Sequence, residues 1–161
     1  NNRQVFVGTG GRGFDPSLPT VVFIHGAGFD HSAWALHSRW FSHHGFAVLA
    51  PDLPEHGHSA GPALTSISAM ADWIAALLAA TNAKPAHLIG HSMGSLIALE
   101  AAARHPACVT RLSLIEIAVA FGAALCLLGD FPFSDTAGFT LAAAVALWQW
   151  RQRPRNAMAA A

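Results

Sequence analysis

Leu88 to Glu100 read L-I-G-H-S-M-G-S-L-I-A-L-E, and Gly90 to Gly94 within this segment form the pentapeptide G-x-S-x-G. A short apolar run precedes the pentapeptide and a small-residue helical pattern follows it. A strand that turns sharply into a helix presents a serine at its apex, where the hydroxyl is exposed as a nucleophile. A side chain at Gly90 or Gly94 would collide with the neighbouring strand and helix. The pattern predicts such an elbow around Ser92, and the alternative is a purely structural glycine-rich turn.

Two further segments each consist of an apolar strand followed by a loop with distinctive residues. Residues 20–24 (TVVFI) lead into H-G-A-G at residues 25–28, and residues 46–50 (FAVLA) lead into P-D-L-P-E-H-G-H-S at residues 51–59. In this order the three motifs resemble those of the α/β-hydrolases: an HGxG-type loop, a D-x-x-x-x-G-x-S loop and a GHSMG elbow. The resemblance covers about residues 3–115. Glu55 departs from it, because the family usually has a small residue there.

The resemblance implies a serine hydrolase that acts on a small-molecule ester or related acyl substrate and needs no cofactor. Ser92 would be the nucleophile, and the backbone N–H groups of Ala27 and Met93 would hold the oxyanion. Four glycines would shape the loop and the elbow: Gly26, Gly28, Gly90 and Gly94. Glu116 directly follows the predicted strand at 111–115 and is the candidate catalytic acid. Its alternative role is a carboxylate at a helix N-terminus, where the helix dipole would stabilise it.

The catalytic base cannot be assigned from the sequence, and no strand–loop–histidine pattern follows Glu116. His91 adjoins the nucleophile but should point away from the substrate side. Four histidines lie in loops on the catalytic face, where we expect structural or solvent-exposed roles: His25, His31, His56 and His58. The ten histidines do not predict a metal site, because the pairs His43-His44 and His56-x-His58 lack a convincing third ligand.

Strands that alternate with helices predict an α/β fold with a doubly wound, mostly parallel sheet, α/β-hydrolase-like and C-terminally truncated. Strands are expected at residues 4–7, 20–24, 46–50, 86–89 and 111–115, and helices at 32–43, 66–81 and 93–104. Ser66 is the expected N-cap of the second helix. Ligands of such sheets bind beyond the carboxyl ends of the strands, where all three motifs lie. We expect a hydrolase core at residues 1–116 and an apolar helical segment with an alanine-rich tail at 117–161.

Composition excludes some classes of function. The chain has 161 residues, zero formal net charge and 11% charged residues, and the absence of a basic stripe argues against nucleic-acid binding. Two cysteines and no visible signal peptide favour a cytoplasmic protein. A membrane span is disfavoured, because the apolar segments at 117–128 and 139–150 would each be about 18 Å long as helices, against roughly 30 Å of hydrocarbon.

The sequence leaves two alternatives to a hydrolase open. One is a non-catalytic α/β-hydrolase-like module that binds a ligand or a partner, and the weaker one is a membrane-associated protein. We also expect self-association through the C-terminal third of the chain. The strand at 111–115 would be an unprotected edge with free N–H and C=O groups, and such edges recruit other chains.

Overall fold

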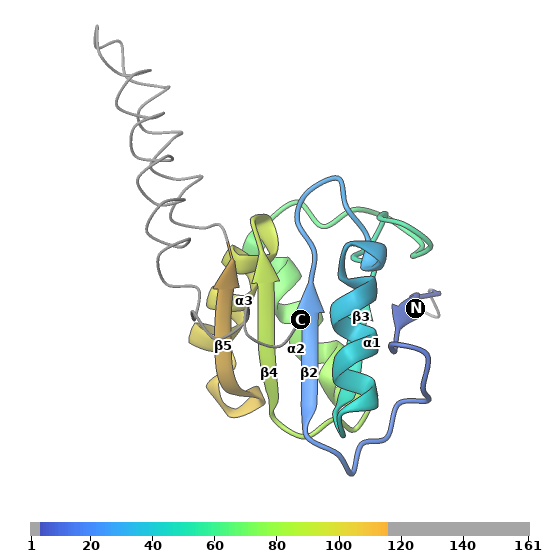
Figure 1. Cartoon of the computed structure of the whole chain (residues 1–161). Coiled ribbons are helices and arrows are strands. Elements are labelled where there is room, and N and C mark those ends of the chain that lie inside the picture. Colours follow the sequence, from blue (N-terminus) through green and yellow to red (C-terminus); the bar gives the residue numbers. More distant parts are fainter. Residues whose placement is uncertain (1–3, 116–161) are drawn as a thin grey trace, which may run out of the picture. The chain divides into compact units, whose positions relative to one another are not determined.

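The computed structural model of the chain describes residues 4–115, and its centre is a five-stranded sheet in the order β1-β3-β2-β4-β5 (Figure 1). The strands are β1 (Val7–Gly8), β2 (Thr20–Ile24), β3 (Ala47–Pro51), β4 (Ala86–His91) and β5 (Val109–Ile115). Only β1 is antiparallel to its neighbour, and the other three pairings are parallel. The predicted α/β class with a mostly parallel sheet is confirmed.

Helices cover both faces of this sheet, as a doubly wound fold requires. They are η1 (His31–Trp34), α1 (Ala35–His43), α2 (Ile67–Ala80), α3 (Met93–Arg104) and η2 (Pro106–Cys108). Figure 1 shows α1 on one face and α2 with α3 on the other. The predicted cap of the second helix is confirmed, because the Ser66 hydroxyl accepts a hydrogen bond from the Ala69 N–H at 3.1 Å.

Alternation along the strands divides the buried side chains into two cores, because successive residues of a strand point to opposite faces. Val22, Leu49 and Leu88 pack with residues of α2 and α3, including Ile74 and Ile97. On the other face, a second cluster surrounds Trp34: Val21, Phe23, Val48, Ala50 and Ile89. Both faces of the central strands are therefore buried, and this packing fixes the positions of the carboxyl ends of these strands.

The first strand differs from the prediction of residues 4–7, because the backbone before Val7 pairs with a loop. The N–H of Phe6 donates to the Ser59 hydroxyl at 3.0 Å. The carbonyl oxygens of Gln4 and Phe6 accept from Ala60 and Asp52, each at 3.0 Å. This segment is thus extended but follows the loop after β3, and only Val7 and Gly8 join the ladder.

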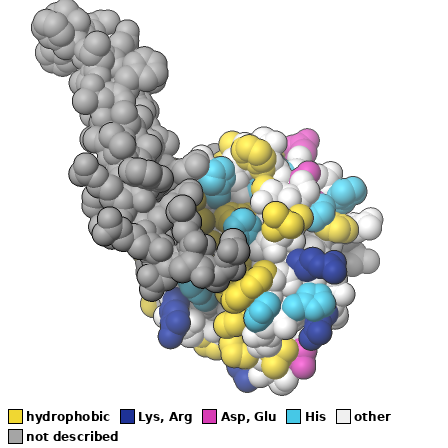
Figure 2. Space-filling model, in the orientation of Figure 1, with side chains coloured by type: hydrophobic (Ala, Val, Ile, Leu, Met, Phe, Trp, Pro, Cys, Tyr) yellow, Lys and Arg dark blue, Asp and Glu magenta, His cyan; other side chains and the backbone are white. Residues whose placement is uncertain are grey.

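Several large hydrophobic side chains are exposed on the surface of the described part. On α1, Leu36 is 82% exposed and Trp40 is 54% exposed. Histidine and hydrophobic side chains gather on the face that α1 covers, with few acidic groups among them (Figure 2). Within residues 4–115, no helix is both long and apolar enough to cross a membrane. The predicted apolar segments at 117–128 and 139–150 lie outside the described residues.

Candidate active site

Ser92 lies between β4 and α3 in a backbone conformation that L-residues rarely adopt. Its φ is 52° and its ψ is −118°, and it is half-buried. Such strain persists only where the surroundings over-determine the backbone, and it is concentrated at functional sites. The Ser92 N–H donates to the carbonyl of Ile115 at 3.1 Å, and the Ser92 carbonyl accepts from the Ser95 N–H at 2.9 Å. The strand–turn–helix predicted from the pentapeptide is therefore present.

The two glycines of the pentapeptide have the steric role that the sequence predicted. A Cβ atom on Gly90 would overlap the backbone of Gly94 at the start of α3. A Cβ atom on Gly94 would overlap the carbonyl oxygen of Ile24 at the end of β2. Both obstacles are backbone atoms of packed elements, so neither can move aside. The helix can approach the sheet this closely only because both positions lack a side chain.

Ser95 also holds the elbow, and the sequence analysis missed it. Its side chain is completely buried. The hydroxyl lies 2.7 Å from the Gly90 carbonyl oxygen and 3.0 Å from that of Ile115, and it accepts the Ile115 N–H at 3.1 Å. Because a hydroxyl has a single proton, it can donate to only one of the two carbonyl oxygens at a time. Ser95 thereby joins the end of β5 to the elbow; a small polar residue inside an apolar helical pattern was the available signal.

The predicted oxyanion loop lies against the elbow. A Cβ atom on Gly26 would be 3.3 Å from the Cβ atom of Ser92 and 3.1 Å from Nδ1 of His91, so only glycine fits this approach easily. Gly28 has a φ of +73° in open space, where glycine is favoured by conformation alone. Ala27, between them, is exposed. Met93 is the first residue of α3, where a backbone N–H has no intrahelical acceptor.

His25 is a structural residue of this loop. Its side chain is fully buried. Leu53 donates its N–H to Nε2 at 3.1 Å, so the ring proton lies on Nδ1, which donates to the Gly26 carbonyl at 2.8 Å. Burial lowers the pKa of His25 below its ordinary value, because the charged ring would lose its hydration. A neutral His25 therefore ties the loop after β2 to the loop after β3.

A cavity of about 240 Å³ lies on the α1 side of the elbow. It is lined by Phe29, Ala33, Trp34, His37, His91 and Ile115. The His91 ring makes edge contacts with Phe29 and Trp34, with ring centres 5.8 and 6.4 Å apart. It shares a sheet face with Ile89, two residues earlier in the strand. Aromatic rings dominate this lining, which suits an apolar group of a small ligand.

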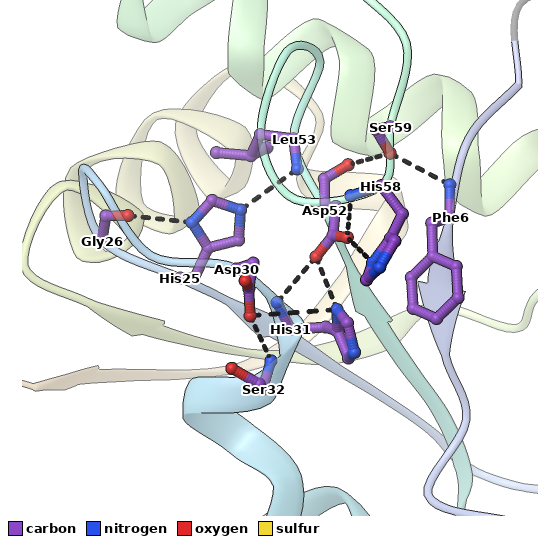
Figure 3. A network of polar contacts seen from close by, with 10 residues as sticks. All are labelled: Phe6, His25, Gly26, Asp30, His31, Ser32, Asp52, Leu53, His58 and Ser59. Carbon is purple, nitrogen blue, oxygen red and sulfur yellow. Dashed lines mark hydrogen bonds and ion pairs between the residues drawn. The ribbon is translucent and has the colours of Figure 1, made fainter.

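Two of the other loop histidines, His31 and His58, contact Asp52, whose side chain is completely buried just after β3 (Figure 3). Oδ1 accepts the backbone N–H and Nδ1 of His31 at 2.7 and 2.8 Å, and Oδ2 accepts the His58 N–H at 2.8 Å. Burial alone would raise the pKa of Asp52, but these hydrogen bonds outweigh it and hold the pKa below its ordinary value. Nδ1 of His56 contacts the Pro54 carbonyl at 3.1 Å.

This cluster bears on the prediction that the histidines form no metal site. From the sequence, the pair His56-x-His58 lacks a convincing third ligand. The fold instead brings His31 and Asp52 to His58, with one ligand atom of each within 4.8 Å of the others. Partners 21 residues apart in sequence carry no local pattern that would have revealed them.

Two acidic residues singled out in the sequence, Glu116 and Glu55, differ in what the structure describes of them. Glu116 follows Ile115 by one peptide bond and lies outside the described residues, so its predicted role as catalytic acid stays a prediction. Glu55 has a φ of 66° and its Oε2 accepts the Ala63 N–H at 2.9 Å. Its long side chain thus closes the loop in which the family usually has a small residue.

Comparisons with known proteins agree with this geometry. Residues 19–151 match the family model described as alpha/beta hydrolase fold. Over 115 residues the chain is 36% identical to the pimeloyl-[acyl-carrier protein] methyl ester esterase of Methylococcus capsulatus, covering 69% of this chain and 40% of that protein. It is 34% identical over 97 residues to the (E)-2-((N-methylformamido)methylene)succinate hydrolase of Acinetobacter baylyi, covering 60% of this chain and 36% of that protein.

Solved structures give the same result. The crystal structure of a membrane phospholipase A, described as a novel bacterial virulence factor, superposes with a TM-score of 0.60 at 32% identity, covering 70% of this chain and 39% of that chain. The chain spans about two fifths of the length of the curated relatives described above. These relatives are named esterases and hydrolases.

Proposed function

Because the chain belongs to the α/β-hydrolase family, we propose that it is a serine hydrolase that acts on esters or related acyl substrates through Ser92. The observation that carries the proposal is the strained backbone of Ser92, with φ 52° and ψ −118° at the junction of β4 and α3. A turn that only connected two elements would have no need of this strain, whereas a nucleophile must be lifted above the neighbouring strands.

The proposed reaction proceeds through an acyl-enzyme. The Ser92 Oγ attacks the carbonyl carbon of the substrate as a general base removes its proton, and the carbonyl oxygen becomes an oxyanion. The N–H groups of Ala27 and Met93 would stabilise that charge, and each such donor typically contributes about 10²–10³ in rate. The alcohol then leaves with a proton, and water hydrolyses the ester formed on Ser92. Glu116 is the proposed acid that orients the base, and the base itself is unassigned.

The substrate proposal rests on the surroundings of Ser92. The cavity lined by Trp34, His91 and Ile115 adjoins the elbow, because the Ile115 carbonyl accepts the Ser92 N–H. In this proposal His91 therefore faces the substrate, contrary to the expectation from the sequence. The aromatic lining of the cavity favours the apolar part of an acyl or alcohol group over a charged one. The Methylococcus relative is named for the hydrolysis of a methyl ester, and this agrees with an ester as the reacting group.

The experiment is to label the purified chain with a fluorophosphonate, which reacts covalently with activated serine hydroxyls, and to locate the label by mass mapping. We expect stoichiometric labelling of Ser92 and none in Ser92→Ala. The Ser92→Ala variant should also lose the hydrolysis of short p-nitrophenyl esters. The matched control is Ser32→Ala, which removes an exposed hydroxyl while the backbone N–H that donates to Asp30 remains; both signals should be unchanged.

Two results would contradict the proposal. Ester hydrolysis that continues at the parent's rate in Ser92→Ala would arise from other groups, such as surface histidines. A folded chain whose Ser92 takes up no label would have an unactivated serine, and it would fit a non-catalytic module that uses the same face for binding.

A further inference from the structure

The cluster of His31, Asp52 and His58 lies at the start of η1 and in the loop after β3. It has no part in the proposed hydrolysis. Its carboxylate is completely buried, while the His31 side chain is 24% exposed and that of His58 is 70% exposed. The buried side of the site is therefore formed by Asp52, directly after β3, and its histidine side is open to solvent. An ion from solution could reach it without unfolding of the loop.

We propose that His31, Asp52 and His58 bind a divalent transition-metal ion of the zinc class. Two imidazoles and one carboxylate form a donor set that suits zinc, and three protein ligands leave a fourth position for water. Metal–ligand distances of about 2.0–2.2 Å in tetrahedral geometry set neighbouring ligand atoms roughly 3.3 Å apart. Nδ1 of His31 lies 2.8 Å from Asp52 Oδ1, and Nδ1 of His58 lies 3.5 Å from Asp52 Oδ2. These two distances bracket the tetrahedral spacing, and one ligand atom of each residue lies within 4.8 Å of the others.

The carboxylate is already oriented for such an ion. The backbone N–H of His31 donates to Oδ1 and that of His58 donates to Oδ2. A carboxylate has about four lone-pair positions, so these two bonds leave room for a metal. Only the side-chain bond from His31 has to be exchanged, and its ring proton then moves from Nδ1 to Nε2. Hydrogen bonds of this kind fix metal ligands in place and are a large part of a site's affinity.

The two imidazoles are also held by an apolar wall. The Phe6 ring lies 4.4 Å from the His31 ring and 4.9 Å from the His58 ring, measured between centres. Figure 3 shows dashed lines from Asp52 to both histidines, with the Phe6 ring next to His58. Phe6 is held in turn by its N–H bond to Ser59, whose hydroxyl donates to the Asp52 carbonyl at 2.7 Å. An ion here would link the start of η1 to the loop after β3, and Phe6 would pack against both histidine ligands.

The test is calorimetric titration of the metal-free full chain with Zn²⁺. We expect one saturable site per chain, and affinity reduced at least about ten-fold in His58→Ala and in His31→Ala, because even partners outside the ligand set typically cost 10–100-fold. His43→Ala is the matched control, since it removes an exposed histidine at the end of α1, and it should bind like the parent. Co²⁺ should give the intense visible bands of tetrahedral coordination in the parent and not in His58→Ala.

Each other outcome overturns the proposal. Weak binding of several ions that is equally sensitive to His43→Ala and His58→Ala would be adventitious binding to surface histidines. A parent chain without saturable binding would make the cluster a structural hydrogen-bond network. Ser92→Ala should bind Zn²⁺ like the parent, so this test stands or fails separately from the proposed hydrolase activity.

Discussion

The conformation of Ser92 predicts that glycine should be the most stable replacement for it. A φ of 52° with a ψ of −118° is the mirror image of an ordinary extended conformation, so it is relaxed only for a residue without Cβ. Other residues there have a strain of about 1–3 kcal/mol, while glycine loses about 0.5–1 kcal/mol through the greater freedom of the unfolded chain. Ser92→Gly should therefore be more stable than Ser92→Ala, by up to about 2.5 kcal/mol.

The comparison between the two variants isolates the backbone, because both lack the hydroxyl. The assay is urea denaturation followed by circular dichroism, with the free energy of unfolding taken from the midpoint and slope. Ala76 provides the matched control, since it is exposed in the interior of α2; there Ala76→Gly should lose about 1 kcal/mol. A loss of similar size on going from Ser92→Ala to Ser92→Gly would mean that Ser92 is unstrained and that the elbow argument is wrong.

Three further predictions concern the acid, a buried histidine and assembly. Glu116→Gln should reduce ester hydrolysis far more than Glu55→Gln, because Glu55 only closes its loop onto Ala63; equal small effects would remove Glu116 from the site. Since burial lowers the pKa of His25 below its ordinary 6.5, the unfolded chain binds a proton there that the folded chain does not. The free energy of unfolding should thus be independent of His25 above pH 6.5, and it should decrease as the pH is lowered below 6.5. The His25→Gln variant should lack that pH dependence. An NMR titration showing that His25 has its ordinary pKa in the folded chain would contradict this. Among residues 4–115, β5 pairs only with β4, and Leu114 and Ile115 are 38% and 40% exposed, so light scattering should detect self-association at high micromolar concentration. A clean monomer with slow hydrogen exchange at residues 112–115 would mean that this edge is covered.

The parts of the fold that the sequence predicted are those with local signals. Periodicity and caps are properties of neighbouring residues, so Ser66 and the bounds of α3 were predictable. The elbow was predictable because its whole pattern lies within five residues, where a side chain on Gly90 would overlap the backbone of Gly94. The first strand was misplaced because its partner, the loop that contains Ser59, decides its pairing. An apolar run alone cannot distinguish a ladder strand from an extended segment bonded to a loop.

The site was only partly predictable for the same reason. The sequence indicates which residues can react, and it indicated Ser92 and its loops. It does not indicate which polar groups meet after folding. Asp52 and His31 are 21 residues apart, and Ser95 is 20 residues from Ile115. Buried polar side chains such as these have to find partners, because an unsatisfied buried group costs about 1–3 kcal/mol. Their identity could be suspected from the sequence, but their partners could not.

These buried polar groups explain how a strained elbow is kept in place. His25 joins the loop after β2 to the loop after β3, and Ser95 joins β4 to the end of β5. Gly26 brings the loop after β2 against Ser92 itself. The carboxyl ends of four neighbouring strands are thereby connected, with the elbow in the middle of the row. Strain at Ser92 can be maintained because relaxation of its backbone would break contacts on both sides. A substitution at Ser95 should therefore impair the reactivity of Ser92 although Ser95 contacts no substrate, and the defect should accompany a loss of stability.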